Sequence, residues 1–232
     1  VIIGEGTWVG SNVIIMEGAR IGKNCSIFPG SVISAIPQDL KFNGEDSLVV
    51  INDNTTIREC VTINRGTSDR GETTIGKNCL IMAYCHVAHD CIIGDNCIFS
   101  NNSTLAGHVS VGNHAILAGF VAVHQFCSIG DHAFIAGGSL VRKDIPPYVK
   151  AAREPISYVG INSVGLRRRG FKASKIQEIQ NIYRILFQNK YNNSQAADII
   201  EAELAATPER DEILQFIKNS QRGIMKGYFQ KN

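Results

Sequence analysis

The sequence is poor in aromatic residues, in charge of one sign and in long apolar runs. Aromatic residues make up 7% of the 232 positions, which favours a core of aliphatic side chains over one of large rings. Lysine and arginine (23) nearly balance aspartate and glutamate (21), and the net charge of +2 argues against bulk binding of nucleic acid. No apolar run is long enough to span a bilayer, and no signal peptide is visible, so we expect a cytoplasmic protein without an integral membrane segment.

The seven cysteines lack the spacing of a metal site, because none forms a Cys-x2-Cys pair. Six of them instead recur at multiples of six residues: Cys25, Cys79, Cys85, Cys91, Cys97 and Cys127. Free cysteine commonly packs like a small apolar residue. We therefore predict six reduced, buried cysteines in a reducing compartment, with no bound metal.

An apolar residue recurs at every sixth position over most of the chain. The series is Ile3, Val9, Ile15, Ile21, Ile27, Ile33, Ile51, Ile57, Ile63, Ile75, Ile81, Val87, Ile93, Phe99, Leu105, Val111, Leu117, Val123, Ile129, Ile135 and Val141. It fails at Asp39, Glu45 and Asp69, which predicts insertions near 35–50 and 65–74. A six-residue period fits neither a helix nor a hairpin sheet and is typical of a parallel β-helix.

Two other positions of each hexad refine this architecture. The position four residues after the apolar one is small, which suits a narrow prism with three flat faces. Three hexads then make one coil, and residues one coil apart stack at about 4.8 Å. Asn, Asp and His recur at the position that precedes the small residue, as at Asn24, His114 and His132, and we predict that they form corners with positive φ. The pattern resembles the left-handed hexapeptide-repeat β-helix, and the hand is taken from that resemblance.

The repeat ends at Pro146 and Pro147, because proline cannot donate to a strand ladder. We predict a β-helix over 1–147, followed over 148–232 by a wrapping loop (148–170) and an α-helical domain. Ser174, Ser194 and Thr207 are the expected caps of three helices. The first helix should bury Ile176, Ile179, Tyr183, Leu186 and Phe187 on one face. Val1 already lies within the repeat with no preceding Met, so we expect the natural chain to begin earlier.

Stacking of successive coils brings the polar residues of three hexads to one edge of the prism. They are His86, His89, Asp90, Gly107, His108, His124 and Gln125. A neutral imidazole is a natural general base, and a backbone N–H beside a glycine can stabilise an oxyanion. His89 and Gly107, one coil apart, could supply both for acyl transfer. Alternatively, His86, His89, His108 and His124 could ligate a metal, although they lack the His-x4-His pair of hexapeptide-repeat carbonic anhydrases.

Longer motifs make the resemblance specific. They are Gln38-Asp39-Leu40-Lys41, His86-Val87-Ala88-His89-Asp90-Cys91, Leu105-Ala106-Gly107-His108, Val123-His124-Gln125-Phe126, Asp144-Ile145-Pro146-Pro147-Tyr148 and Arg168-Arg169-Gly170-Phe171. With them, the whole chain resembles the bacterial UDP-N-acetylglucosamine O-acyltransferases, which make the first committed transfer in lipid A synthesis. The resemblance implies a homotrimer with sites between prisms and a 3-hydroxyacyl donor on acyl carrier protein. The acceptor would be the 3-hydroxyl of UDP-N-acetylglucosamine, with no cofactor beyond the carrier's phosphopantetheine.

The resemblance also implies roles for single residues. His89 matches the general base, Asp90 the carboxylate that orients it, and Gly107 the oxyanion donor. Gly137 matches a position that acts as a hydrocarbon ruler, and a glycine there implies a long acyl chain. Positions that contact substrate are matched by Asp39, Lys41, His86, His108, His124, Gln125, Asn162, Arg168 and Arg169. Val164 stands where family members often have Glu.

Two rival functions stay open at this point. The N-acyltransferase that acts later in the same pathway, on UDP-3-O-acyl-glucosamine, is also a hexapeptide trimer with a catalytic histidine. It usually carries an additional N-terminal uridine-binding domain, of which this sequence shows no trace. A non-catalytic trimeric scaffold would use the repeat but would not account for the histidines along one edge.

Overall fold

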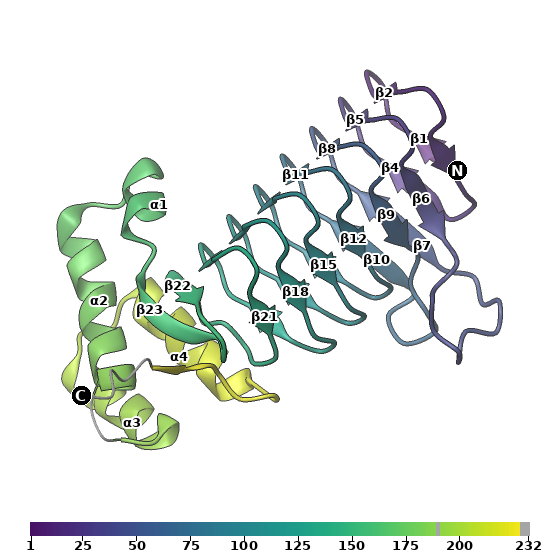
Figure 1. Cartoon of the computed structure of the whole chain (residues 1–232). Coiled ribbons are helices and arrows are strands. Elements are labelled where there is room, and N and C mark those ends of the chain that lie inside the picture. The colour runs from purple at the N-terminus through teal and green to yellow at the C-terminus, as the bar shows by residue number, and fades with distance from the viewer. Residues whose placement is uncertain (189–190, 228–232) are drawn as a thin grey trace.

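The computed structural model describes residues 1–188 and 191–227, which form a long prism with a helical region at the end far from the N-terminus (Figure 1). The prism is a left-handed parallel β-helix, as predicted. Its three faces are parallel sheets, here named A, B and C. Each passage of the chain around the prism contributes one short strand to each sheet in turn.

The strands of the three sheets follow the six-residue period. Sheet A contains β1 (Ile2–Ile3), β4 (Ala19–Ile21), β7 (Leu48–Ile51), β10 (Glu72–Ile75), β13 (Ile92–Ile93), β16 (Ser110–Val111) and β19 (Ser128–Ile129). Sheet B contains β2 (Trp8–Val9), β5 (Ser26–Ile27), β8 (Thr56–Ile57), β11 (Leu80–Ile81), β14 (Ile98–Phe99), β17 (Ile116–Leu117), β20 (Phe134–Ile135), β22 (Val149–Ala152), β23 (Ser157–Ile161) and β24 (Lys226–Gly227). Sheet C contains β3 (Ile14–Ile15), β6 (Val32–Ala35), β9 (Thr62–Asn64), β12 (His86–Val87), β15 (Thr104–Leu105), β18 (Ala122–Val123) and β21 (Leu140–Val141).

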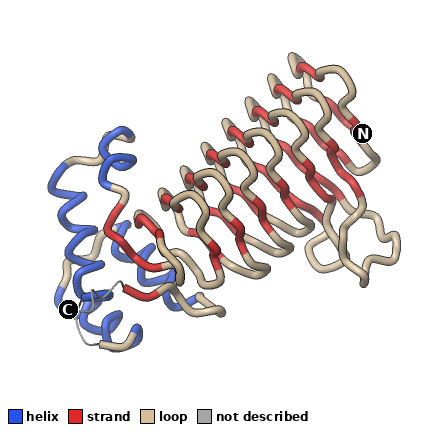
Figure 2. The backbone as a smooth tube through the Cα atoms, in the orientation of Figure 1, coloured by secondary structure: helices blue, strands red, loops and turns tan. Residues whose placement is uncertain are grey.

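The register confirms that residues three hexads apart stack, since Leu105 pairs with Val87 on one side and with Val123 on the other. Two loops interrupt this register and project from the prism (Figure 2). The first, residues 36–47, connects β6 to β7, and the second, residues 65–71, connects β9 to β10. Both lie within the ranges where the period fails, and each lets the chain leave the coil and rejoin it in register.

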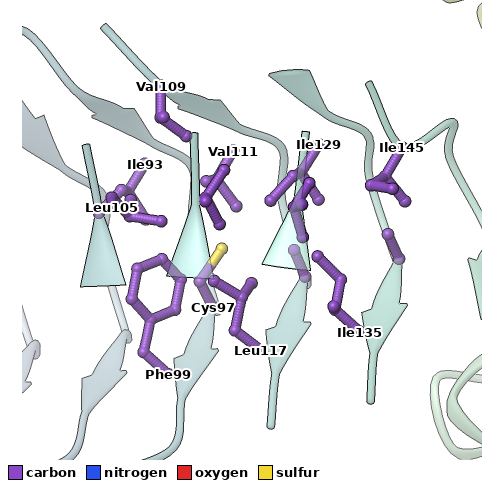
Figure 3. Packing of buried hydrophobic residues seen from close by; sticks show 14 of the residues in the cluster. Ile93, Cys97, Phe99, Leu105, Val109, Val111, Leu117, Ile129, Ile135 and Ile145 are labelled. Atoms are coloured by element: carbon purple, nitrogen blue, oxygen red, sulfur yellow. The ribbon is translucent and has the colours of Figure 1, made fainter. Parts of the chain in front are cut away.

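The core is a column of aliphatic side chains that runs the length of the prism. Isoleucines such as Ile57, Ile63 and Ile75 are completely buried, and each contributes about 1.5–3 kcal/mol by leaving water. Figure 3 shows Cys97 pointing into this column beside Phe99 and the aliphatic side chains of neighbouring coils. The six cysteines predicted to be packing residues are buried and free of disulfides. A large and a small inward residue per hexad thus fill the narrow prism.

The corners have the backbone conformation that the sequence predicts. Asn96, His114 and His132 have φ values of 59°, 57° and 58°, in the left-handed region that Asn and His tolerate better than most residues. Asp90 and His108 share this corner position, with φ values of 59° and 62°. The side chains of corner residues therefore point along the edges of the prism.

The segment 148–170, predicted to be a wrapping loop, instead contains two strands and a short helix. Strand β22 extends sheet B by pairing with β20, and β23 pairs with β22 in antiparallel fashion. Phe134 pairs with Lys150, an interval shorter than three hexads, so this strand falls outside the register that revealed the others. Helix α1 (Ser163–Arg168) follows β23. The expected division at Pro147 falls between β21 and β22, and the expected end at 232 lies beyond the described residues.

Three further helices, α2 (Ala173–Gln188), α3 (Asn193–Glu203) and α4 (Pro208–Asn219), pack at this end. Thr207 caps α4 with Pro208 at its first position, as predicted. Two predicted caps are wrong: α2 begins one residue before Ser174, and Asn192 rather than Ser194 caps α3. Asn and Ser are comparable caps, and Asn192 gains from a reciprocal bond with the Gln195 side chain.

The predicted face of α2 is buried, and Tyr183, which is completely buried, donates a hydrogen bond to the carbonyl of Pro147 (2.6 Å). This bond anchors the helical region to the end of the prism. In residues 1–188 and 191–227, no helix has the length and apolar character needed to cross a membrane.

Candidate active site

One edge of the prism, between sheets C and A, carries most of the polar residues singled out from the sequence. We call it the histidine edge and define it by the stacked corners 89–90, 107–108 and 125–126. Backbone hydrogen bonds join these corners, from His108 N to His89 O (3.0 Å) and from Phe126 N to Gly107 O (3.2 Å). The register of sheet C therefore fixes how the side chains of successive coils meet.

His89 and Asp90 form a hydrogen-bonded pair at this edge. The His89 Nδ1 atom lies 2.8 Å from Asp90 Oδ2, and the Asp90 side chain is completely buried. Because an ionised carboxylate can only accept, this bond places a hydrogen on Nδ1 and leaves Nε2 of a neutral His89 with a free lone pair. The pair thus has the arrangement of a base and the group that orients it.

The Asp90 carboxylate accepts further hydrogen bonds from loop 65–71. Thr67 donates its backbone N–H to Oδ1 (3.0 Å) and its hydroxyl to Oδ2 (2.7 Å), and Arg70 N lies 3.3 Å from Oδ1. Burial by itself would raise the pKa of the Asp90 carboxyl, but the hydrogen bonds from His89 and Thr67 outweigh it and lower the pKa below its ordinary value. Asp90 is therefore ionised near neutral pH.

Gly107 makes room for the imidazole of His89. A Cβ atom on Gly107 would lie 2.6 Å from both Cε1 and Nε2 of His89, well inside ordinary contact distance. The ring of His89 therefore lies directly against the backbone of the next coil. This contact puts the free Nε2 atom beside the Gly107 main chain.

His108 completes the group. Its ring meets that of His89 edge-on at 5.0 Å and stacks on Phe126 at 4.5 Å. Its Nε2 lies 3.8 Å from Asp90 Oδ2, and its Nδ1 lies 3.2 Å from Asp69 Oδ2. The second contact lacks the alignment of a hydrogen bond.

The remaining histidines of this region flank the group rather than join it. His86 Nδ1 lies 2.7 Å from the Thr62 hydroxyl, and burial, with a smaller effect of His89, lowers the pKa of His86. His124 and Gln125 are exposed, and His124 Nδ1 lies 3.1 Å from the Gln125 carbonyl oxygen. The structure therefore brings together His89, Asp90, Gly107 and His108 and leaves His86 and His124 to either side.

A metal site built on the four histidines is not what the structure presents. In the described part of the chain, the group whose ligand atoms all lie within 4.8 Å of one another is His89, Asp90 and His108, without His86 or His124. The 2.8 Å between His89 Nδ1 and Asp90 Oδ2 is a hydrogen-bond distance, and Thr67 and Arg70 already donate to the same carboxylate. This donor set suits an oriented base better than an open coordination sphere.

The other predicted site residues lie elsewhere in the chain. Asp39 and Lys41 lie in loop 36–47, where Asp39 Oδ1 accepts from Lys41 N (3.0 Å). Gly137 is exposed at the edge between sheets B and C, where a Cβ would lie 3.1 Å from the Gly119 carbonyl oxygen. Loop 36–47 leaves the prism at the edge between sheets C and A, the same edge that carries the histidines, whereas Gly137 lies on a different edge.

Asn162, Arg168 and Arg169 belong to the third edge, between sheets A and B. Asn162 caps α1 and donates to the His132 carbonyl (2.9 Å), while Arg169 donates to the His114 carbonyl (3.0 Å). The side chain of Arg168 is exposed. At this edge the stacked rings of His114 and His132 are 4.7 Å apart, and burial, followed by the charges of His114 and Arg169, lowers the pKa of His132 to about 4.

Sequence reasoning missed the residues that hold Asp90. Thr67 and Arg70 lie in loop 65–71, which the period identified only as an interruption. Glu45, in the other loop, accepts a hydrogen bond from Ser68 N (3.0 Å), so the two interruptions meet beside the site. The interruptions of the period could have indicated these residues, because an otherwise regular repeat is interrupted twice at the same edge of the prism.

Comparisons with known proteins point to one family of acyltransferases. A family model for UDP-N-acetylglucosamine O-acyltransferase, domain 2, matches residues 144–225, and one for the bacterial transferase hexapeptide (six repeats) matches 1–35 and 72–107. The acyl-[acyl-carrier-protein]–UDP-N-acetylglucosamine O-acyltransferase of Aquifex aeolicus is 53% identical over 86% of this chain and 77% of its own length. That of Myxococcus xanthus is 45% identical over 86% and 78%.

Solved structures give the same result. The crystal structure of the UDP-N-acetylglucosamine acyltransferase of Bacteroides fragilis 9343 has a TM-score of 0.94 and 47% identity, covering 97% of this chain and 95% of its own. The Acinetobacter baumannii structure has a TM-score of 0.93 and 40% identity, covering 97% and 88%. On these likenesses, the chain belongs to the UDP-N-acetylglucosamine O-acyltransferase family.

Proposed function

We propose that this protein transfers a 3-hydroxyacyl group from acyl carrier protein to the 3-hydroxyl of UDP-N-acetylglucosamine, in lipid A synthesis. The names of its relatives supply the two reactants. The observation that carries the proposal is the His89–Asp90 pair, held against Gly107 with Nε2 free. A sugar hydroxyl needs such a base to attack a thioester at neutral pH.

The reaction proceeds through one tetrahedral intermediate. His89 Nε2 accepts the proton of the sugar 3-hydroxyl as its oxygen attacks the thioester carbonyl. The Gly107 N–H donates to the oxyanion that forms, and Asp90 stabilises the imidazolium. The intermediate then collapses by breaking the carbon–sulfur bond, and the imidazolium returns its proton to the leaving thiolate. The products are the 3-O-acyl sugar nucleotide and the free thiol of the carrier, and we propose that no metal or other cofactor takes part.

Residues around the pair would bind the acceptor sugar. The exposed side chains of His124 and Gln125 lie one coil beyond Gly107. His86 lies in the strand just before His89, and the ring of His108 contacts the ring of His89. Asp39 and Lys41, in loop 36–47, offer a carboxylate and a cation at the surface. We assign all six to substrate binding, because hydrogen-bonding groups of both kinds are what a polar sugar requires.

The diphosphate of the nucleotide or the phosphate of the carrier's pantetheine would bind at α1. Arginine recognises phosphate through its planar fork of donors, and Arg168 is exposed, while the adjacent Arg169 donates to the His114 carbonyl. Asn162 fixes the start of this helix. The basic run from Arg167 to Lys175 would also attract the acidic acyl carrier protein.

A homotrimer would bring these parts together. Within one prism, His89, Gly137 and Arg168 belong to three different edges, so one substrate meets all three most directly where copies of the chain adjoin. Apolar side chains beside the base support the same view, since Phe126 is 51% exposed and Ile92 is 47% exposed in the single chain. Gly137 would then border the acyl groove and leave space for a long chain. The mass of the purified protein in light scattering tests the assembly.

The activity is tested with purified protein, 3-hydroxyacyl carrier protein and UDP-N-acetylglucosamine. We expect O-acylation, and a loss of at least about 10²-fold in His89→Ala at unchanged melting temperature. UDP-3-O-acyl-glucosamine as a second acceptor identifies the rival N-acyltransferase, and folded protein that transfers to neither acceptor indicates a scaffold. Retained activity in His89→Ala would overturn the role of His89 as the base.

A further inference from the structure

Loop 65–71, which interrupts the repeat between β9 and β10 and projects from the prism (Figure 2), donates hydrogen bonds to the buried carboxylate of Asp90. Thr67 contributes two of them and is itself only 7% exposed. Arg70 donates from its guanidinium to the Asp90 carbonyl oxygen (2.7 Å), which ties the loop to the corner from a second side. The loop is therefore held to the catalytic pair rather than left free at the surface.

The Thr67 hydroxyl has one available acceptor for its hydrogen. Thr67 Oγ1 accepts a hydrogen bond from Asp69 N (3.3 Å), and it lies 2.7 Å from Asp90 Oδ2. A hydroxyl has a single hydrogen, and an ionised carboxylate can only accept. The hydroxyl therefore donates to the same carboxylate oxygen that receives the Nδ1 hydrogen of His89.

We propose that Thr67 is a positioning residue for acyl transfer, which holds Asp90 ionised and oriented so that His89 presents Nε2 to the substrate. The proposal rests on the function proposed above, because it needs His89 to be the base. If Asp90 were protonated, its own hydrogen would point at one of the donors that now face the carboxylate. The Nδ1–H group of His89 would then lose its charged acceptor. Thr67 disfavours that state with two hydrogen bonds, from its N–H and from its hydroxyl.

Removing the hydroxyl should change both the rate and its dependence on pH. Without this donor, the charge on Asp90 is less neutralised and attracts the imidazolium more strongly, so the acidic limb of the pH–rate profile should move upward. The carboxylate is also freer to turn, and the base is less well aimed. Other titratable groups that face the pair are His86, His108, Asp69, Arg70 and Glu45, and all of them are retained in the test variants.

The test compares Thr67→Val, which keeps the shape, with Thr67→Ser, which keeps the hydroxyl. The matched control is Thr55→Val, because Thr55 is completely buried in the prism and its hydroxyl bridges Cys79 N and the Gly76 carbonyl (3.0 and 2.7 Å), away from Asp90. We expect Thr67→Val to lower kcat about tenfold or more with little change in KM, and to move the acidic limb of the pH–rate profile upward. Thr67→Ser should stay within about threefold of the natural protein, and Thr55→Val should lower the melting temperature without moving the limb.

Several outcomes would overturn the proposal. A folded Thr67→Val with natural kcat and pH profile would do so, and so would a loss no different in kind from that of Thr55→Val. If Thr67→Val does not fold, 15N NMR of histidine-labelled natural protein decides, because an Nε2–H tautomer of His89 contradicts the assignment and an Nδ1–H tautomer supports it. His89→Ala is assayed in parallel: activity there defeats the role of His89 as the base, on which this proposal rests, and absence of transfer by the natural protein defeats the proposed function. Loss of activity in His89→Ala beside an unaffected Thr67→Val defeats only the role of Thr67.

Discussion

Adding one methyl group at Gly107 should disable the enzyme without unfolding it. In Gly107→Ala, the new Cβ would lie 2.6 Å from Cε1 and Nε2 of His89 and 3.2 Å from Nδ1. Ordinary contact begins at about 3.4 Å, so the imidazole must move by about 0.8 Å or more, away from the position in which Asp90 holds it. A displacement of about 1 Å in a reacting group costs about 10²-fold in rate. We therefore expect kcat to fall by about two orders of magnitude.

The assay is steady-state acyl transfer, with the melting temperature as the measure of folding. Gly119→Ala is a matched control, because its Cβ would meet only the Asn101 carbonyl oxygen, at 3.4 Å, and no side chain of the histidine edge. The φ of Gly107 lies outside the left-handed region, so alanine introduces no backbone strain there. The variant keeps its N–H, so a loss of rate reports on the base rather than on the oxyanion donor. Natural kcat in a folded Gly107→Ala would refute the conclusion that this placement of His89 matters.

Three other predictions concern the corner residue His132, the acyl-chain position Gly137 and the removal of metal ions. Burial lowers the pKa of His132 to about 4. Below about pH 6.5 the unfolded chain therefore binds a proton at this histidine that the folded chain does not bind. The free energy of unfolding should fall as the pH is lowered from about 6.5 to about 4. Allowing for partial access of water, the loss is about 1–2 kcal/mol in denaturant titrations, and His132→Asn, which suits the corner, should abolish it. Gly137→Met should shift preference toward shorter acyl donors in a competition assay, and unchanged selectivity would remove the ruler role. Prolonged dialysis against EDTA should leave kcat unchanged, and metal-restorable loss of activity would instead favour a metal bound near His89, Asp90 and His108.

The period alone predicted most of the prism and part of the site. A residue's place in the hexad determines whether it faces the core, as Cys97 does, or forms a corner, as Asp90 and His108 do. Stacking of successive coils then predicts that Gly107 lies next to His89, and the two are in contact. These predictions succeed because each coil repeats the hydrogen bonding of the last one, so sequence distance translates into spatial distance.

The features that could not be predicted are those that leave the period. Strand β22 stacks on β20 after less than three full hexads, so the stretch after the two prolines was mistaken for a loop. The path of loop 65–71 is decided by contacts with Asp90, which no local pattern encodes. Asn192 and Ser194 have similar capping strength, so the sequence does not distinguish them as the N-cap of α3. The hydrogen bond from Asn192 N to the Gln195 side chain favours Asn192.

The buried charge of Asp90 explains why the repeat is broken beside this corner. In a regular coil, backbone N–H groups are used by the neighbouring coil, as when His108 N donates to His89 O. A corner of such a coil can donate one N–H to a side chain of the next coil, as when Lys77 N donates to Asp95 Oδ1 (2.7 Å), yet a fully buried carboxylate needs several donors to stay ionised. Loop 65–71, which lies outside the period, supplies the further donors through Thr67 and Arg70. The interruption of the β-helix at this edge thus supplies donors that keep the buried partner of His89 ionised.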